Sequence, residues 1–118
     1  MRYEVRDGAL WTLVLQLRER SPMAKLNVVL CAPVRTAIGT YGGTLKGVPA
    51  PVLGAAVIES ALKRAKLKGD EVDTVVMGQV VQAGAKMNPA RQAMRGAGMP
   101  VEVPAMTVNR VCGSGAQA

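Results

Sequence analysis

The chain has 118 residues, 49% of them hydrophobic, which excludes a disordered protein and suits one domain or part of one. Its net charge is +7, but the basic residues form no block, and Trp11, Tyr3 and Tyr41 provide no stacking platform for single strands. We therefore expect no nucleic-acid partner. The two cysteines, Cys31 and Cys112, form no C-x-x-C pair and no disulfide framework, which favours a cytoplasmic protein.

Residues 1–22 differ in character from the rest of the chain. Mixed charges flank an apolar-leaning stretch, 9–17, that is far too short to cross a bilayer. Acidic residues at the start and the lack of a small-residue cleavage site weigh against a targeting segment, which stays the alternative. We predict that residues 1–22 are an extension outside the fold, that Met23 begins the domain 23–118, and that no membrane is a partner.

The first elements of the domain alternate between strand and helix patterns. Residues 26–34, LNVVLCAPV, are a continuous apolar run, which predicts a strand buried on both faces. The Gly-rich stretch 39–49 fits neither common phosphate-binding pattern and predicts a loop. Residues 51–65 carry apolar side chains at helical spacing, and Gly69 is the expected stop.

The second half of the chain repeats this alternation. The β-branched run 72–81 predicts a second strand, and Asn88 followed by Pro89 predicts a capped helix that ends near Gly96. Residues 104–111 predict a third strand, and 113–118 predict the start of a third helix. This order indicates an α/β sheet with helices on its faces.

Cys112 lies where the last predicted strand turns into a helix. Unpaired N–H groups at a helix start stabilise a thiolate, and the Cys112 N–H could donate to an oxyanion. Gly113 and Gly115 leave room for a substrate carbonyl. A cysteine nucleophile normally needs a base such as histidine, and the chain has none. The alternative is a small buried hydrophobe, which is the interpretation we favour for Cys31.

Three stretches of the domain resemble one family. They are APVRTAIGTYGGTLKGVPAPVLGAAVIESAL, DEVDTVVMGQVVQAGAKMNPARQA and PAMTVNRVCGSGAQA, which together extend over most of residues 26–118. They are similar to the N-terminal part of a thiolase, of the biosynthetic acetyl-CoA acetyltransferase type. The last stretch matches the family's Asn-x-x-Cys-x-Ser-Gly pattern at Asn109, Cys112, Ser114 and Gly115.

The resemblance implies a reversible condensation of two acetyl-CoA to acetoacetyl-CoA through an acetyl thioester on Cys112. It implies Cys112 as nucleophile and oxyanion donor, with Asn109, Gly113, Ser114 and Gly115 as the supporting motif. Coenzyme A thioesters would be substrates, with no permanently bound cofactor and no metal. The family's histidine and second cysteine lie downstream, so we expect this chain alone to be inactive.

The resemblance also implies a fold and leaves two other functions open. It implies an incomplete N-terminal half of a thiolase-like fold, a mixed sheet with helices on both faces, of which this chain supplies about three strands, two helices and the start of a third. An uncovered sheet would favour self-association, and the family implies a homo-oligomer, a dimer or a tetramer. The alternatives are a degradative 3-ketoacyl-CoA thiolase and a non-catalytic binding or interaction module.

Overall fold

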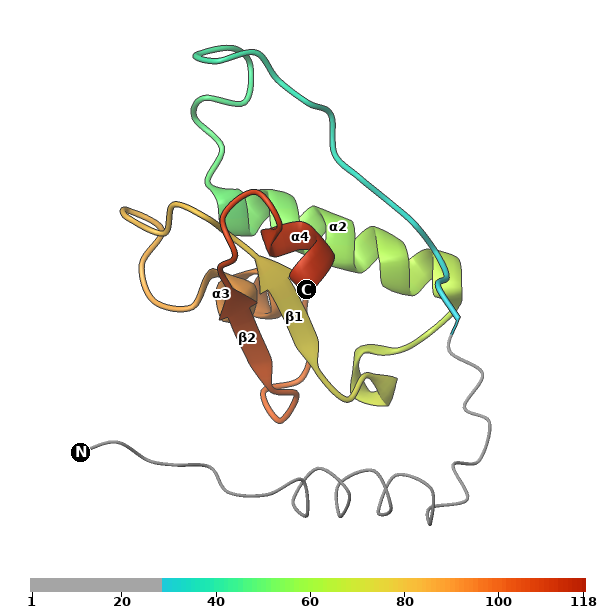
Figure 1. Cartoon of the computed structure of the whole chain (residues 1–118). Coiled ribbons are helices and arrows are strands. Elements are labelled where there is room, and N and C mark those ends of the chain that lie inside the picture. Colours follow the sequence, from blue (N-terminus) through green and yellow to red (C-terminus); the bar gives the residue numbers. More distant parts are fainter. Residues whose placement is uncertain (1–28) are drawn as a thin grey trace, which may run out of the picture.

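The computed structural model describes residues 29–118, and the predicted extension 1–22 lies outside this part of the chain. Helices and strands alternate along it (Figure 1), as the sequence predicts. In chain order the elements are helix α2 (Ala50–Ala65), the 3-10 turn η1 (Gly69–Glu71), strand β1 (Val75–Gly78), helix α3 (Pro89–Gly96), strand β2 (Ala105–Val108) and helix α4 (Ser114–Gln117). No helix among these described residues is long and apolar enough to span a membrane.

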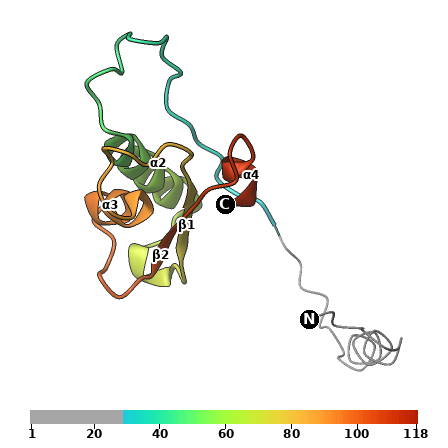
Figure 2. The same cartoon turned by 60° about the vertical axis from the view of Figure 1, so that its left-hand side comes forward.

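The two strands form a parallel pair. Val75 lies opposite Ala105, and Gly78 lies opposite Val108. Parallel strands need a crossover connection, which α3 provides. Helices α2 and α3 lie on one side of the sheet and α4 on the other (Figure 2). This arrangement confirms the α/β class and the placement of helices on both faces.

The core lies between α2, α3 and the sheet. Met94 and Met99 are its largest fully buried side chains, and Val103 is buried with them. Partly buried apolar residues pack around these three, namely Ile58, Leu62, Val72, Val75 and Ala105. Ile58 and Leu62 belong to the helical repeat seen in the sequence, so the periodicity of 51–65 predicts the buried face of α2 correctly.

Helices α2 and α3 approach closely at a glycine. Gly54 is buried, and a Cβ atom there would lie 2.9 Å from the Cβ of Ala93 and 3.1 Å from the Cε of Met77. Only a residue without a side chain fits this contact. The two helices therefore pack directly against each other and against β1.

Polar side chains cap the start of α3 and connect its first turn to the segment before β2. Asn88, with φ 45°, accepts a hydrogen bond from the N–H of Arg91 at 3.2 Å, and Pro89 follows in the first turn. This confirms the cap predicted from the Asn-Pro pair. The Arg91 guanidinium donates to the carbonyl oxygens of Val103 at 2.6 Å and Val101 at 2.8 Å, which ties α3 to the segment before β2.

The prediction of a strand over 26–34 is wrong for its described part, residues 29–34, which adopt no regular structure. A strand needs a partner, and this segment instead lies beside the last turn of α2, where Arg64 donates to the carbonyl of Pro33 at 2.8 Å. Leu30 is fully exposed, and Cys31 is exposed rather than buried as expected. The described sheet consequently has two strands.

Candidate functional site

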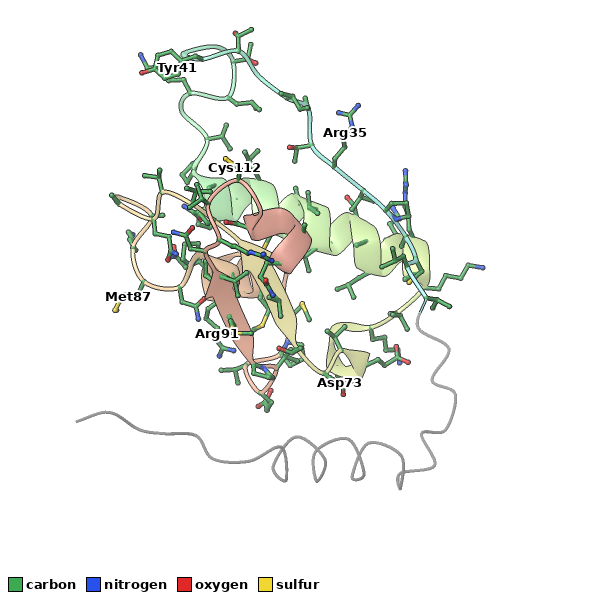
Figure 3. The ribbon with its side chains drawn as sticks, viewed as in Figure 1. Arg35, Tyr41, Asp73, Met87, Arg91 and Cys112 are labelled. Atoms are coloured by element: carbon green, nitrogen blue, oxygen red, sulfur yellow. The ribbon has the colours of Figure 1, made fainter. Side chains whose placement is uncertain are left out.

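Cys112 lies in the turn that joins β2 to α4, and its side chain is exposed (Figure 3). Gly113 is the cap residue of α4, and Ser114 is its first residue. The sequence therefore predicts the place of the thiol correctly, after a strand and before a helix. The helix is only four residues long, and Cys112 lies outside it.

The turn is built around an unusual backbone conformation at Val111. Its φ is 47°, in the left-handed region that a β-branched residue rarely adopts. The amide oxygen of Asn109 accepts from the N–H of Val111 at 2.9 Å, and the hydroxyl of Ser114 donates to the Val111 carbonyl at 2.6 Å. Both supporting-motif side chains thus contact the residue that precedes the thiol.

The same two side chains connect the turn to its surroundings. The amide nitrogen of Asn109 donates to the carbonyl of Val80, just beyond β1, at 2.9 Å. Ser114 is buried, and its hydroxyl also accepts from the N–H of Arg110 at 2.9 Å. The turn is therefore held to the carboxyl end of the sheet and closed upon itself.

Helix α4 rests on the sheet through a glycine of β1. A Cβ atom at Gly78 would lie 2.4 Å from the carbonyl carbon and oxygen of Ser114 and 2.8 Å from the nitrogen of Gly115. The backbones of β1 and α4 touch here because Gly78 has no side chain. A Cβ at Gly115 would meet nothing within 4 Å, so the space beside Gly115 is open, as a substrate approaching the thiol would need.

The turn supplies a thiol and hydrogen-bonding groups but lacks the usual proton acceptor. Histidine is absent from the sequence, and the Arg110 guanidinium donates to Gln117 at 3.2 Å. Within residues 29–118, no three Cys, Asp or Glu side chains come together as metal ligands would. The described part of the chain therefore presents an accessible thiol on a fixed turn, and the sequence offers no histidine to activate it.

Sequence reasoning missed two hollows, and neither includes Cys112 in its lining. An apolar cavity of about 280 Å³ lies against α2 and α3, where Gly54, Val57 and Met77 form part of its wall. A wide open depression beside the last turns of α2 is lined by basic groups that include Arg35 and Lys63.

The chain matches a known family over most of its length. Residues 28–118 match the model of the thiolase N-terminal domain. The acetyl-CoA acetyltransferase of Cupriavidus necator is 55% identical over 92 residues, which is 78% of this chain and 23% of that protein. The acetyl-CoA acetyltransferase of Chromobacterium violaceum is 50% identical over 93 residues, 79% of this chain and 24% of that protein.

A third relative is named an acyltransferase rather than an acetyltransferase. The probable acetyl-CoA acyltransferase of Staphylococcus aureus is 53% identical over 89 residues, 75% of this chain and 23% of that protein. The chain thus spans about a quarter of the length of these curated relatives. The family match begins at residue 28 and contains the whole turn around Cys112. The chain therefore belongs to the thiolase family.

Proposed function

We propose that this chain is the N-terminal part of an acetyl-CoA acetyltransferase in which Cys112 accepts the acetyl group. One observation carries the proposal. An exposed thiol stands on a fixed turn within a segment that is 55% identical to a protein named acetyl-CoA acetyltransferase. Acyl transfer between two bulky thioesters needs a covalent carrier that substrates can reach, and an exposed cysteine is suited to that role.

The proposed reaction has two steps. The Cys112 thiolate attacks the carbonyl carbon of acetyl-CoA, the new S–C bond forms, and coenzyme A leaves as its thiolate. A second acetyl-CoA loses an α-proton, and its carbanion attacks the acetyl-cysteine to form a C–C bond. Acetoacetyl-CoA results, and the Cys112 thiolate is released. The Cys112 N–H would stabilise the oxyanion in both steps. The open space beside Gly115 leaves an approach to the thiol, whereas a Cβ at Gly113 would lie 3.3 Å from the Arg110 carbonyl oxygen.

The chain alone is not a complete catalyst in this proposal. Proton removal from the thiol and from the second acetyl-CoA needs acid–base groups, and the sequence has no histidine. We further propose that coenzyme A thioesters are substrates and that no cofactor is permanently bound. The complete protein would act in the cytoplasm as a homo-oligomer.

A chimera tests the proposal. Residues 28–118 replace the corresponding first quarter of the Cupriavidus necator protein, and acetoacetyl-CoA formation from acetyl-CoA is measured. We expect activity in the chimera, its loss in Cys112→Ser, and its retention in the control Cys31→Ser. A Cys112→Ser chimera as active as its parent would refute the assignment.

The name of the Staphylococcus aureus relative supports a second candidate, a thiolase that cleaves longer 3-ketoacyl-CoA substrates. The same chimera distinguishes the two candidates when cleavage of acetoacetyl-CoA is compared with cleavage of a six-carbon or longer 3-ketoacyl-CoA. A higher kcat/KM for the longer substrate would favour the degradative assignment. A chimera inactive on every substrate, although folded, would favour a non-catalytic module.

A further inference from the structure

The backbone of Val111 determines how Cys112 is presented. The Val111 carbonyl and the Cys112 N–H belong to one planar trans peptide group, so they point in opposite directions. Whatever holds the carbonyl also sets the direction of the N–H. At φ 47° Val111 itself has a backbone conformation that a β-branched residue does not adopt readily.

Two side chains hold Val111 from both sides. Asn109 binds its N–H at 2.9 Å and Ser114 binds its carbonyl oxygen at 2.6 Å. We call Asn109 and Ser114 the Val111 clamp. Each member has a second anchor, since Asn109 donates to the carbonyl of Val80 at 2.9 Å and Ser114 accepts from Arg110 N at 2.9 Å. Ser114 is 4% exposed, so its bonds are shielded from water.

We infer that Asn109 and Ser114 are positioning residues that keep Val111 in the left-handed conformation and thereby aim the N–H of Cys112 at the oxyanion. The inference rests on the proposed function of Cys112, because an oxyanion forms only if Cys112 is acylated. It gives the clamp a specific role: acyl transfer depends on it, whereas a reaction of the same thiol without an oxyanion does not.

Two reactions of the Cys112 thiol distinguish an effect on the oxyanion from an effect on the thiol itself. Acetylation by acetyl-CoA passes through an oxyanion, whereas alkylation by iodoacetamide is a direct displacement at carbon that forms none. Both rates are measured on the 118-residue chain carrying Cys31→Ser, which leaves Cys112 as its single thiol. Both reactions are run at the same mildly alkaline pH, about 9, so that the solvent rather than a protein base takes up the thiol proton. The acetyl adduct adds about 42 Da to the intact mass, as one acetyl group on sulfur requires.

The expected result is a change in the ratio of the two rates. Asn109→Ala and Ser114→Ala each lower the ratio of acetylation to alkylation by about tenfold, because a misdirected N–H no longer stabilises the oxyanion. The control Gln117→Ala removes a hydrogen bond of the same turn, from Arg110 at 3.2 Å, without touching Val111. Its ratio stays within about twofold of the parent, as expected for a surface change.

A rescue experiment distinguishes a positioning role of Asn109 from a general contribution to the stability of the fold. Glycine adopts positive φ readily, so in a Val111→Gly background the turn needs no clamp. Asn109→Ala should then change the ratio by less than about twofold, since the remaining backbone bonds still close the turn. If Asn109→Ala lowers the helical circular dichroism, the comparison of Asn109→Ala with and without Val111→Gly decides, because both chains lose the same bond to the Val80 carbonyl.

Separate outcomes overturn the two proposals. A Cys112→Ser chimera as active as its parent would overturn the proposed function. A parent chain that is alkylated at Cys112 but never acetylated would overturn the clamp, since its turn would then stabilise no oxyanion. A parent that is acetylated, with unchanged ratios in Asn109→Ala and Ser114→Ala, would overturn the clamp alone. Equal losses in the parent and in the Val111→Gly background would also overturn the clamp, since the conformation of residue 111 would then be irrelevant.

Discussion

At the scale of single residues, one arginine connects α3 to the segment that leads into β2. Arg91 donates to two backbone carbonyls, at 2.6 Å and 2.8 Å, and its side chain is only partly exposed. Charged donors make stronger hydrogen bonds than neutral ones, and a planar guanidinium can serve two acceptors at once. Arg91 therefore stabilises the fold although it lies far from the thiol along the chain.

Replacing Arg91 should destabilise the chain measurably. We expect Arg91→Ala to lower the free energy of unfolding by about 2–3 kcal/mol, because two carbonyls lose a charged donor. Urea denaturation followed by circular dichroism measures the change. The control Arg35→Ala removes an exposed bond to the carbonyl of the next residue and should cost less than about 0.5 kcal/mol. Equal losses would contradict a specific role for Arg91.

At the scale of elements, the packing of α2 on α3 depends on the missing side chain of Gly54. An added methyl group would overlap with Ala93 and Met77. Helix propensity alone favours alanine over glycine inside a helix by about 1 kcal/mol. For Gly54→Ala, packing therefore predicts a loss of folding stability, whereas helix propensity predicts a gain.

We expect packing to win, with Gly54→Ala lowering the free energy of unfolding by about 1–2 kcal/mol, because overpacking costs about 1–3 kcal/mol. Differential scanning fluorimetry with an extrinsic dye gives the direction, and urea denaturation gives the size. Gly47→Ala is the control, since a Cβ there would meet nothing within 4 Å. A rise in stability for Gly54→Ala would show that the helices can move apart freely.

A third substitution tests the contact between β1 and α4. Gly78→Ala would place a methyl group 2.4 Å from the backbone of Ser114, so α4 and the turn before it must shift. We expect α4 to detach and proteases to cut the chain after Arg110 at least about tenfold faster, as local opening requires. Limited trypsin digestion with mass spectrometry measures this rate. Unchanged cleavage would mean that α4 is already detached in solution.

The sequence predicts the helices of this chain better than its strands. Periodic apolar residues and the Asn88-Pro89 pair are local signals, so α2 and α3 are predicted almost to the residue. The apolar run 26–34 signals burial but not which strand lies beside it, and its described part has none. Gly69 is the stop that the sequence predicts for α2, yet Lys66 ends the helix with φ 57°, because a left-handed cap does not require glycine.

The sequence likewise predicts only part of the candidate site. The position of Cys112 between strand and helix follows from local sequence, as does the openness around Gly115. The left-handed conformation of Val111 and the contact from Asn109 to Val80 could not be predicted. A valine gives no sign of positive φ, and Asn109 and Val80 meet only because the two parallel strands lie side by side.

At the scale of the whole molecule, the two faces of the sheet are covered unequally. Side chains alternate along a strand, and Val75 and Ala105 face the core beneath α2 and α3. Met106 therefore lies on the opposite face, where it is 53% exposed. The four-residue helix α4 rests on that face only at the Gly78 end of β1. An apolar sheet face left open in this way favours self-association.

We expect the chain to self-associate through the open face, and a charge placed there should weaken that association. We expect Met106→Lys to raise the apparent dissociation constant for self-association by about tenfold, because burying an unpaired ammonium is costly. Sedimentation velocity over a concentration series measures it. Ser60→Lys adds the same charge to an exposed position of α2 and is the matched control. Equal effects of the two substitutions would point to net charge rather than to the open face.

The burial of two methionines determines how fast their sulfur atoms are oxidised. Met94 and Met99 are 0% and 1% exposed, whereas Met87 is 90% exposed. Peroxide converts a thioether to a polar sulfoxide, which an apolar interior accommodates poorly. Met87 should oxidise at once and with little effect, while the two inner sulfurs react only when the core opens. Their slow gain of oxygen would record the past openings of each molecule until a reductase removes the oxygen.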